Sequence, residues 1–297
     1  MSLTVYGDAD IADKLKSRIN ELDRLFDATD ENSEIYRLNS DKKAQVSADT
    51  KELLSRSIEL CGRLDGYFDV TVYPAVLEWG FTTGEYKVPD NETLSKLAGR
   101  IDHNFISSDG DTFSLSNGAM LDLGAVAKGY AADVCTAMLK ESAADAAVLN
   151  LGGTIGLYGN KPDGSAFKVG IADPENPAGY FGYLSCKSGV LATSGGYERY
   201  FTAEDGTKYI HILDPKTAKP VDNGIRSVTI FCESGTNADA LSTALFVMGL
   251  DKAEEYYRAN GGFDFMILTD NELYITEGIY DDFTLAEGFD FRLNKVV

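Results

Sequence analysis

The sequence predicts a soluble globular protein built from both helices and strands. Of its 297 residues, 44% are hydrophobic and 25% are charged, which is typical of ordinary soluble domains with a substantial core. Apolar residues recur at steps of three and four from Ile11 to Phe26, and this spacing predicts a long amphipathic helix. The nearly continuous apolar run over residues 146–151 predicts a buried strand that ends at Gly152 and Gly153.

Further helices and strands follow from the same kinds of pattern. A second amphipathic helix is expected over residues 49–64, and a short charged helix over residues 88–100. A hairpin is expected over residues 105–115, around the polar turn at residues 108–111. The remaining expected elements are strands at residues 167–172, 189–197, 209–214, 226–231, 265–268 and 272–275, and helices at residues 236–249 and 253–260.

Charge and composition exclude several classes of protein. The net charge of −20, without a cluster of Lys or Arg, argues against a nucleic-acid partner. No apolar run is long enough to span a membrane. The four cysteines are far apart and form no C-x-x-C pair, which argues against a zinc site with thiolate ligands. Because the chain has only two histidines, a metal site with several histidines is excluded.

The stretch at residues 121–130, LDLGAVAKGY, is the first candidate functional site. It predicts a strand that ends in Leu-Asp-Leu, a tight turn at Gly124, and a helix. Such a turn can present backbone N–H groups to an anion at the helix N-terminus, and Lys128 adds a positive charge that could reach a phosphate. Asp122 can accept hydrogen bonds from a ligand or arrange a cation. The alternative is an ordinary strand-to-helix connection with a surface lysine.

A second candidate site lies on the expected helix at residues 236–249, which we expect to be capped at Thr236 or Asn237. Asp239 and Thr243 are four residues apart and therefore share one face of this helix. Small and apolar neighbours predict that the helix is largely buried. Since a buried carboxylate is costly unless it is paired or binds a cation, Asp239 is a better candidate metal ligand than any surface carboxylate.

Two further segments, one with Trp79 and one with His211, complete the set of candidates. Trp79, the only tryptophan, stands beside Gly80 and Phe81. It either packs in the core or forms part of an aromatic wall for a flat ligand. His211 and Leu213 share one side of the strand expected at residues 209–214, and His211 is either a structural residue or an acid–base group.

Taken in order, these segments resemble the ApbE family of flavin transferases, which move FMN from FAD onto a threonine or serine of an acceptor protein. The sequence departs from the family pattern where Ala218 replaces a usual glycine and Thr29 a usual aromatic residue, and where the early Met-Gly-Thr stretch and the lipobox are absent. The resemblance runs nearly end to end and rests on SEIYRLN (33–39), FDVTV (68–72), WGF (79–81), LDLGAVAKGY (121–130), NLGG (150–153), TSG (193–195), HILDP (211–215) and DALSTA (239–244).

The resemblance implies a fold and a set of ligand contacts. The fold would be α+β, a tandem arrangement related to the T-fold, with FAD in a central cleft. One catalytic domain would span residues 4–297, made of two packed α/β halves whose boundary the sequence does not reveal. By the same resemblance, the flavin site comprises Trp79, Gly80, Phe81 and Leu213, Asp122 and Lys128 contact FAD, and Mg²⁺ is bound by the backbone carbonyl of Ala125 and the side chains of Asp239 and Thr243.

The implied reaction is Mg²⁺-dependent transfer of FMN from FAD with release of AMP. His211 is the first candidate for the general base and Asp239 the second. The expected partners are FAD and an acceptor redox protein with an FMN-binding domain. The resemblance also implies an extracytoplasmic lipoprotein, held at the membrane by an N-terminal lipid whose cysteine would be encoded upstream of Thr4. Two alternatives stay open: an FAD pyrophosphatase that releases FMN and AMP, and an FAD-binding protein without turnover.

Overall fold

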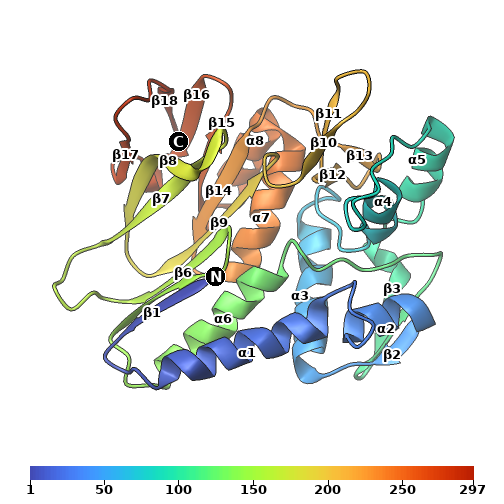
Figure 1. Ribbon diagram of the computed structural model, residues 1–297, viewed down its shortest axis with the longest axis horizontal. Coiled ribbons are helices and arrows are strands. Elements are labelled where there is room, and N and C mark those ends of the chain that lie inside the picture. The colour runs from blue at the N-terminus through green and yellow to red at the C-terminus, as the bar shows by residue number, and fades with distance from the viewer. The chain divides into compact units, whose positions relative to one another are not determined.

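Two units make up the chain in the computed structural model, which describes residues 1–297 apart from the side chain of Pro177. The first unit comprises Met1–Ile19, Lys128–Tyr197 and Asn223–Val297. The second comprises Asn20–Ala127 and Glu198–Asp222. Each unit contains both helices and strands, so the expected α+β class is confirmed (Figure 1).

An eight-stranded sheet forms the centre of the first unit. Neighbouring strands are antiparallel except for the last pair, which is parallel. The strands expected near residues 146, 189, 226, 265 and 272 all lie in this sheet. Its order is β1 (Ser2–Tyr6), β5 (Ala146–Asn150), β6 (Thr154–Gly159), β9 (Gly189–Gly195), β14 (Ser227–Cys232), β15 (Asp264–Leu268), β16 (Glu272–Thr276) and β18 (Arg292–Val296).

Helices cover one face of this sheet (Figure 1). Residues 11–19 of α1 (Ile11–Phe26) and the apolar side of α6 (Ala127–Lys140) pack against β1 and β5. Further along the sheet, α7 (Gly235–Met248) packs on β9 and β14, and α8 (Leu250–Asn260) packs on α7. Because α7 is buried on nearly all sides, a polar side chain on it must find its partners inside the protein.

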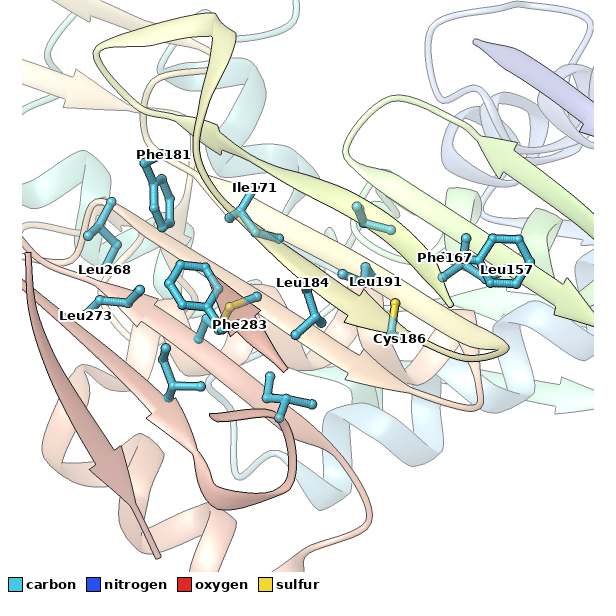
Figure 2. Close-up of a cluster of buried hydrophobic side chains, with 14 of the residues drawn as sticks. Leu157, Phe167, Ile171, Phe181, Leu184, Cys186, Leu191, Leu268, Leu273 and Phe283 are labelled. Atoms are coloured by element: carbon cyan, nitrogen blue, oxygen red, sulfur yellow. The ribbon is translucent and has the colours of Figure 1, made fainter. Parts of the chain in front are cut away.

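A smaller sheet covers the opposite face. It consists of β7 (Phe167–Asp173), β8 (Asn176–Cys186) and β17 (Phe283–Leu285), and α9 (Glu277–Tyr280) packs beside β15 and β16. Figure 2 shows Phe181, Leu184 and Phe283 of this sheet near Leu191, Leu268 and Leu273 of the large one. Along β5 the residues alternate between the two faces: Ala147 and Leu149 face the helices, whereas Ala146 faces the small sheet.

The second unit is mainly helical. It contains α2 (Glu34–Asp41), α3 (Ala48–Arg63), α4 (Tyr73–Glu78), α5 (Asn91–Ala98) and the 3₁₀ helix η1 (His103–Phe105). Side chains of Ser33, Ser47 and Asp90 cap α2, α3 and α5 by accepting backbone hydrogen bonds. Its strands form a small sheet, β2 (Lys43–Gln45), β4 (Thr112–Leu115) and β3 (Ile106–Asp109), and two hairpins, β10 (Tyr200–Thr202) with β11 (Lys208–Ile210) and β12 (Leu213–Asp214) with β13 (Lys219–Pro220).

Three expectations about local structure are wrong. The strand expected over residues 209–214 is interrupted at His211, because Ile210 pairs with Tyr200 in one hairpin and Leu213 pairs with Pro220 in the next. Residues 121–123 form no regular strand. In addition, α7 is capped by Ser234, whose hydroxyl accepts from the Asn237 N–H, and not by Thr236 or Asn237.

The segment 121–123 is held by a side chain. The amide group of Asn39 donates to the Leu121 carbonyl at 2.9 Å and accepts from the Leu121 N–H at 2.6 Å. The Asp122 N–H donates to the Val70 carbonyl. These bonds satisfy the backbone of Leu121 and Asp122 as a strand partner would, so the segment needs no neighbouring strand. Among the described residues, no helix is long and apolar enough to cross a membrane.

Candidate active site

The first turns of α6 and α7 lie in direct contact in the first unit. A Cβ atom on Gly129 would lie 2.0 Å from the carbonyl oxygen of Gly235, and one on Gly235 would lie 2.3 Å from the Gly129 carbonyl oxygen. Only glycine at both positions permits this approach. The closeness of the two backbones fixes where the α7 side chains lie relative to the start of α6.

Asp133 of α6 reinforces this contact by capping α7. Its Oδ1 accepts from the Gly235 N–H at 2.6 Å. Its Oδ2 accepts from the Thr236 N–H at 3.1 Å, the Thr236 hydroxyl at 2.7 Å and the Ser234 hydroxyl at 3.1 Å. A carboxylate that binds the exposed N–H groups at a helix start also interacts favourably with the helix dipole. Asp133 therefore anchors the helix that carries Asp239.

Asp239 is buried, as the sequence predicted, with 5% of its surface exposed. Its Oδ2 accepts from the Gly129 N–H at 2.6 Å, and its Oδ1 accepts from the Thr154 hydroxyl at 2.7 Å. Burial raises the pKa of this carboxyl, while the Lys128 charge and the two hydrogen bonds oppose the rise. Each carboxylate oxygen has two lone pairs, so each can still bind a cation.

Hydroxyl groups surround the next turn of α7. The Ser194 hydroxyl lies 2.8 Å from that of Ser242 and 3.2 Å from that of Thr243. The Ser242 hydroxyl donates to the backbone carbonyl of Asp239 at 2.9 Å. A buried carboxylate and hydroxyl oxygens are hard donors, the kind that Mg²⁺ prefers, so the side chains present in the first unit fit this ion.

The structure divides the predicted metal ligands between the two units. Asp239 and Thr243 belong to the first unit, together with Lys128, whereas Ala125 belongs to the second. Ala125 stands in the turn just before α6, where the N–H groups of Val126 and Ala127 both donate to the Leu123 carbonyl. The complete ligand set therefore stays a prediction.

An aromatic cluster occupies the second unit. The Trp79 ring lies 5.1 Å from that of Tyr209 between centroids, and Tyr86 stacks on Phe201 at 4.8 Å. Phe81 lies 5.8 Å from Phe201. Leu213 is buried in the same cluster. Trp79, Phe81 and Leu213 are thus brought together by the fold, and each has less than a tenth of its surface exposed.

Two backbone positions hold Trp79 in this cluster. Its indole Nε1–H donates to the Ala218 carbonyl at 2.8 Å. Ala218 has φ of 57°, a left-handed conformation, so this turn keeps a glycine-type geometry although alanine stands there. Gly80 has φ of 79°, and a Cβ there would lie 2.1 Å from the Glu85 carbonyl oxygen. Gly80 is therefore required for the turn that follows α4.

His211 lies at the edge of the cluster, 6.5 Å from the Phe81 ring between centroids. Its Nδ1 is 3.1 Å from the Arg199 carbonyl oxygen, and its backbone N–H donates to the same oxygen. Because a carbonyl oxygen can only accept, Nδ1 carries the proton in this bond. Nε2 is then the basic nitrogen of the neutral ring. His211 and Leu213 do not share a strand face as expected, since the strand is broken between them.

Sequence reasoning missed several residues of the first-unit site. Asp133 stands five residues after Lys128 in the predicted helix, but nothing in the sequence shows that it caps a helix a hundred residues away. Thr154 follows the Gly152-Gly153 pair, whose positive φ angles of 81° and 80° confirm a turn. Ser194 lies in the TSG segment that supported the resemblance. That segment was the one available signal for the hydroxyl group beside Thr243.

Fold and sites together define a class of protein: an α+β chain that offers hard oxygen ligands in one unit and an aromatic cluster in the other. A family model described as "ApbE family" matches residues 1–267. The chain belongs to the ApbE family and is an enzyme of its flavin transferase class.

Individual relatives support this assignment. The FAD:protein FMN transferase of Vibrio cholerae serotype O1 is 31% identical over 264 residues, which cover 84% of this chain and 78% of the relative. That of Treponema pallidum is 34% identical over 250 residues, 77% of this chain and 68% of the relative.

Solved structures have the same fold. The apo flavinyl transferase ApbE of Pseudomonas stutzeri superposes with a TM-score of 0.82 at 26% identity, covering 93% of this chain and 90% of that one. The ApbE protein of Thermotoga maritima also gives a TM-score of 0.82, at 30% identity, covering 96% of this chain and 92% of that one. The expected ApbE architecture is thereby confirmed.

Proposed function

We propose that this chain is a Mg²⁺-dependent FAD:protein FMN transferase that attaches FMN to a threonine or serine of an acceptor protein and releases AMP. The observation that carries the proposal is the buried Asp239, one helical turn from Thr243 and beside Lys128. A buried carboxylate next to hydroxyl oxygens suits a cation, and Lys128 at the start of α6 suits a phosphate.

Asp239 and Thr243, with the backbone carbonyl of Ala125, would hold Mg²⁺. Once bound, the ion would supply positive charge to the pyrophosphate, which a chain with net charge −20 otherwise lacks. Lys128 would bind a phosphate oxygen, and Asp122 would contact FAD. Trp79, Gly80, Phe81 and Leu213 would line the flavin site.

The reaction forms one bond and breaks one. The acceptor hydroxyl oxygen bonds to the FMN-side phosphorus of FAD, and the bond from that phosphorus to the oxygen of AMP breaks. The hydroxyl proton must be removed, and the Nε2 of His211 is the proposed base. Asp239, whose pKa is raised by burial, is the second candidate for that role.

Incubation of the protein with FAD, Mg²⁺ and a flavinylatable acceptor tests the proposal. The acceptor should gain covalent flavin fluorescence that persists through denaturing electrophoresis, and AMP should appear in equal amount. Absence of labelled acceptor across several acceptors with FMN-binding domains would contradict the transferase function.

Analysis of products without acceptor separates the two open alternatives. A pyrophosphatase would release FMN and AMP from FAD under these conditions, because water would replace the hydroxyl. An FAD-binding protein without turnover would leave FAD intact for hours at saturating Mg²⁺. The transferase predicts slow FAD loss alone and rapid loss when acceptor is added.

The proposal extends to location and partner, supported by the resemblance alone. The acceptor would be a redox protein outside the cytoplasmic membrane, and this enzyme would be tethered beside it by an N-terminal lipid. Sequencing the codons upstream of Thr4 tests this part. A signal peptide with a lipobox cysteine is expected, and a native start at Met1 would contradict it.

A further inference from the structure

Three side chains of different chemistry meet in the second unit, apart from the residues assigned above. Cys61 lies in the last turn of α3, Asp69 in the segment that follows α3, and His103 opens η1. The Cys61 Sγ, a carboxylate oxygen of Asp69 and a ring nitrogen of His103 all lie within 4.8 Å of one another. His103 Nδ1 and Asp69 Oδ2 are 3.2 Å apart.

We propose that Cys61, Asp69 and His103 bind a divalent transition-metal ion of the zinc class. Sulfur, imidazole nitrogen and carboxylate oxygen are its usual ligands, whereas Mg²⁺ avoids thiolates. In a tetrahedral site with metal–ligand bonds of about 2.0–2.3 Å, ligand atoms lie about 3.3–3.8 Å apart. The Asp69–His103 pair is already near this separation, and the sulfur lies within 4.8 Å of both ligand atoms.

Charge favours the same occupant. A thiolate and a carboxylate carry two negative charges and a neutral imidazole none, so a divalent ion makes the buried group neutral. Asp102 adds negative charge nearby, with its Oδ1 3.9 Å from His103 Nδ1. The His103 side chain is 22% exposed, which gives an ion a path from solvent and leaves a position for water as a fourth ligand.

Surrounding groups orient the ligands. The Asp69 Oδ1 accepts from the Thr71 N–H at 2.9 Å and from the Thr71 hydroxyl at 2.6 Å, which turns Oδ2 toward His103. Hydrogen bonds of this kind fix the orientation of metal-binding carboxylates.

A redox-active thiol and a simple helix cap are the alternatives to a metal site in this cluster. A redox-active thiol is disfavoured, because the Cys61 side chain is fully buried and so is closed to an oxidant or a second thiol in solution. In the second alternative, Asp69 only caps η1, since its Oδ2 also accepts from the His103 N–H at 2.9 Å. The cap needs no sulfur, so participation of Cys61 distinguishes the metal site from the cap.

Cobalt is the probe for thiolate coordination, because thiolate-bound Co²⁺ absorbs in the near ultraviolet and tetrahedral Co²⁺ in the visible. The full chain is freed of metal with a chelator and titrated with Co²⁺ in the presence of excess Mg²⁺, which occupies the proposed Mg²⁺ site. One equivalent should produce both bands, and Zn²⁺ should remove them. The matched control is Cys135→Ala, since Cys135 is an equally buried thiol in the first unit.

Cys61→Ala and His103→Gln should each weaken Co²⁺ binding by about a hundredfold or more, whereas Cys135→Ala should keep wild-type affinity. His103 is partly exposed, so His103→Gln tests the site even if Cys61→Ala fails to fold. Zn²⁺ should raise the melting temperature of the wild type but not of His103→Gln. Absence of the near-ultraviolet band in the wild type, or its survival in either ligand variant, would overturn the proposal.

Discussion

At the scale of single residues, Asp239 is a buried carboxylate whose negative charge is only partly compensated by its neighbours. The Gly129 N–H and the Thr154 hydroxyl are neutral donors, and burial raises the carboxyl pKa although the Lys128 charge opposes the rise. A cation would therefore relieve a cost that these hydrogen bonds leave in place.

We expect Asp239→Asn to lower FMN transfer by about a hundredfold or more and to abolish its dependence on Mg²⁺, because one anionic ligand is lost from a site with few protein ligands. Transfer rates measured across a Mg²⁺ titration check this. Mg²⁺ should also raise the melting temperature of the wild type but not of Asp239→Asn. Asp251→Asn, an exposed carboxylate at the start of α8, is the control. Unchanged activity at limiting Mg²⁺ would show that Asp239 is a structural carboxylate.

His211 offers a second test at this scale, because glutamine can replace one of its functions but not the other. His211→Gln can still donate a hydrogen bond to the Arg199 carbonyl but cannot accept a proton as a base. We expect both His211→Gln and His211→Ala to lose transfer by about a hundredfold while FAD binding is kept. Single-turnover transfer rates and FAD affinities of the wild type and both variants check this expectation. Activity restored in the glutamine variant would identify His211 as a positioning residue.

At the scale of elements, the active-site geometry of the first unit depends on the contact between α6 and α7. The Gly129–Gly235 approach sets the distance between these helices, and Asp133 binds the first N–H groups of α7. Asp239 and Thr243 follow within the next two turns of α7. Changes at Asp133 should therefore reach the metal ligands through the helix itself.

We expect Asp133→Asn to lower the free energy of unfolding by about 1–3 kcal/mol. The amide nitrogen of asparagine is a donor, and it would face the N–H and hydroxyl donors at the start of α7 without an acceptor. It should also raise the Mg²⁺ concentration needed for half-maximal transfer, since α7 loses its fixed start. Urea denaturation and a Mg²⁺ titration of activity measure the two effects. Lower stability with an unchanged Mg²⁺ requirement would mean that Asp133 supports the fold alone.

At the scale of the whole molecule, the chain builds the first unit from three separated segments and the second from two. Strand β9 pairs on one side with β6 from its own segment and on the other with β14 from the C-terminal segment. The small sheet combines β7 and β8 with β17 in the same way. The core between the two sheets joins residues that are a hundred positions apart in sequence, such as Leu184 and Phe283 (Figure 2).

We expect Leu184→Ala to lower the free energy of unfolding by about 2–5 kcal/mol, because it leaves a cavity in the core between the sheets. Urea denaturation followed by far-ultraviolet circular dichroism measures this loss. Leu293→Ala is the control, since Leu293 lies on β18 with its side chain exposed and should change stability by less than about 0.5 kcal/mol. Equal effects of the two substitutions would contradict the assignment of this core.

The sequence by itself determined the elements whose signals are local. The spacing of apolar residues located α1 and α3, and the apolar neighbours of Asp239 showed that it is buried, because periodicity and burial follow from the residues along one helix. The break at His211 was missed because Leu213 pairs with Pro220, and a local pattern does not show which partner a strand will choose.

Only the tertiary structure decided which polar groups meet. Asp133 caps α7, Thr154 binds Asp239, and Cys61 lies beside Asp69 and His103. The metal site proposed for the last cluster would reverse the expectation that no thiol binds a metal, an expectation based on the absence of a short spacing motif. Short motifs arise when one turn supplies several ligands. Here each group comes from a different segment, so their proximity depends on packing between elements that the sequence order does not specify.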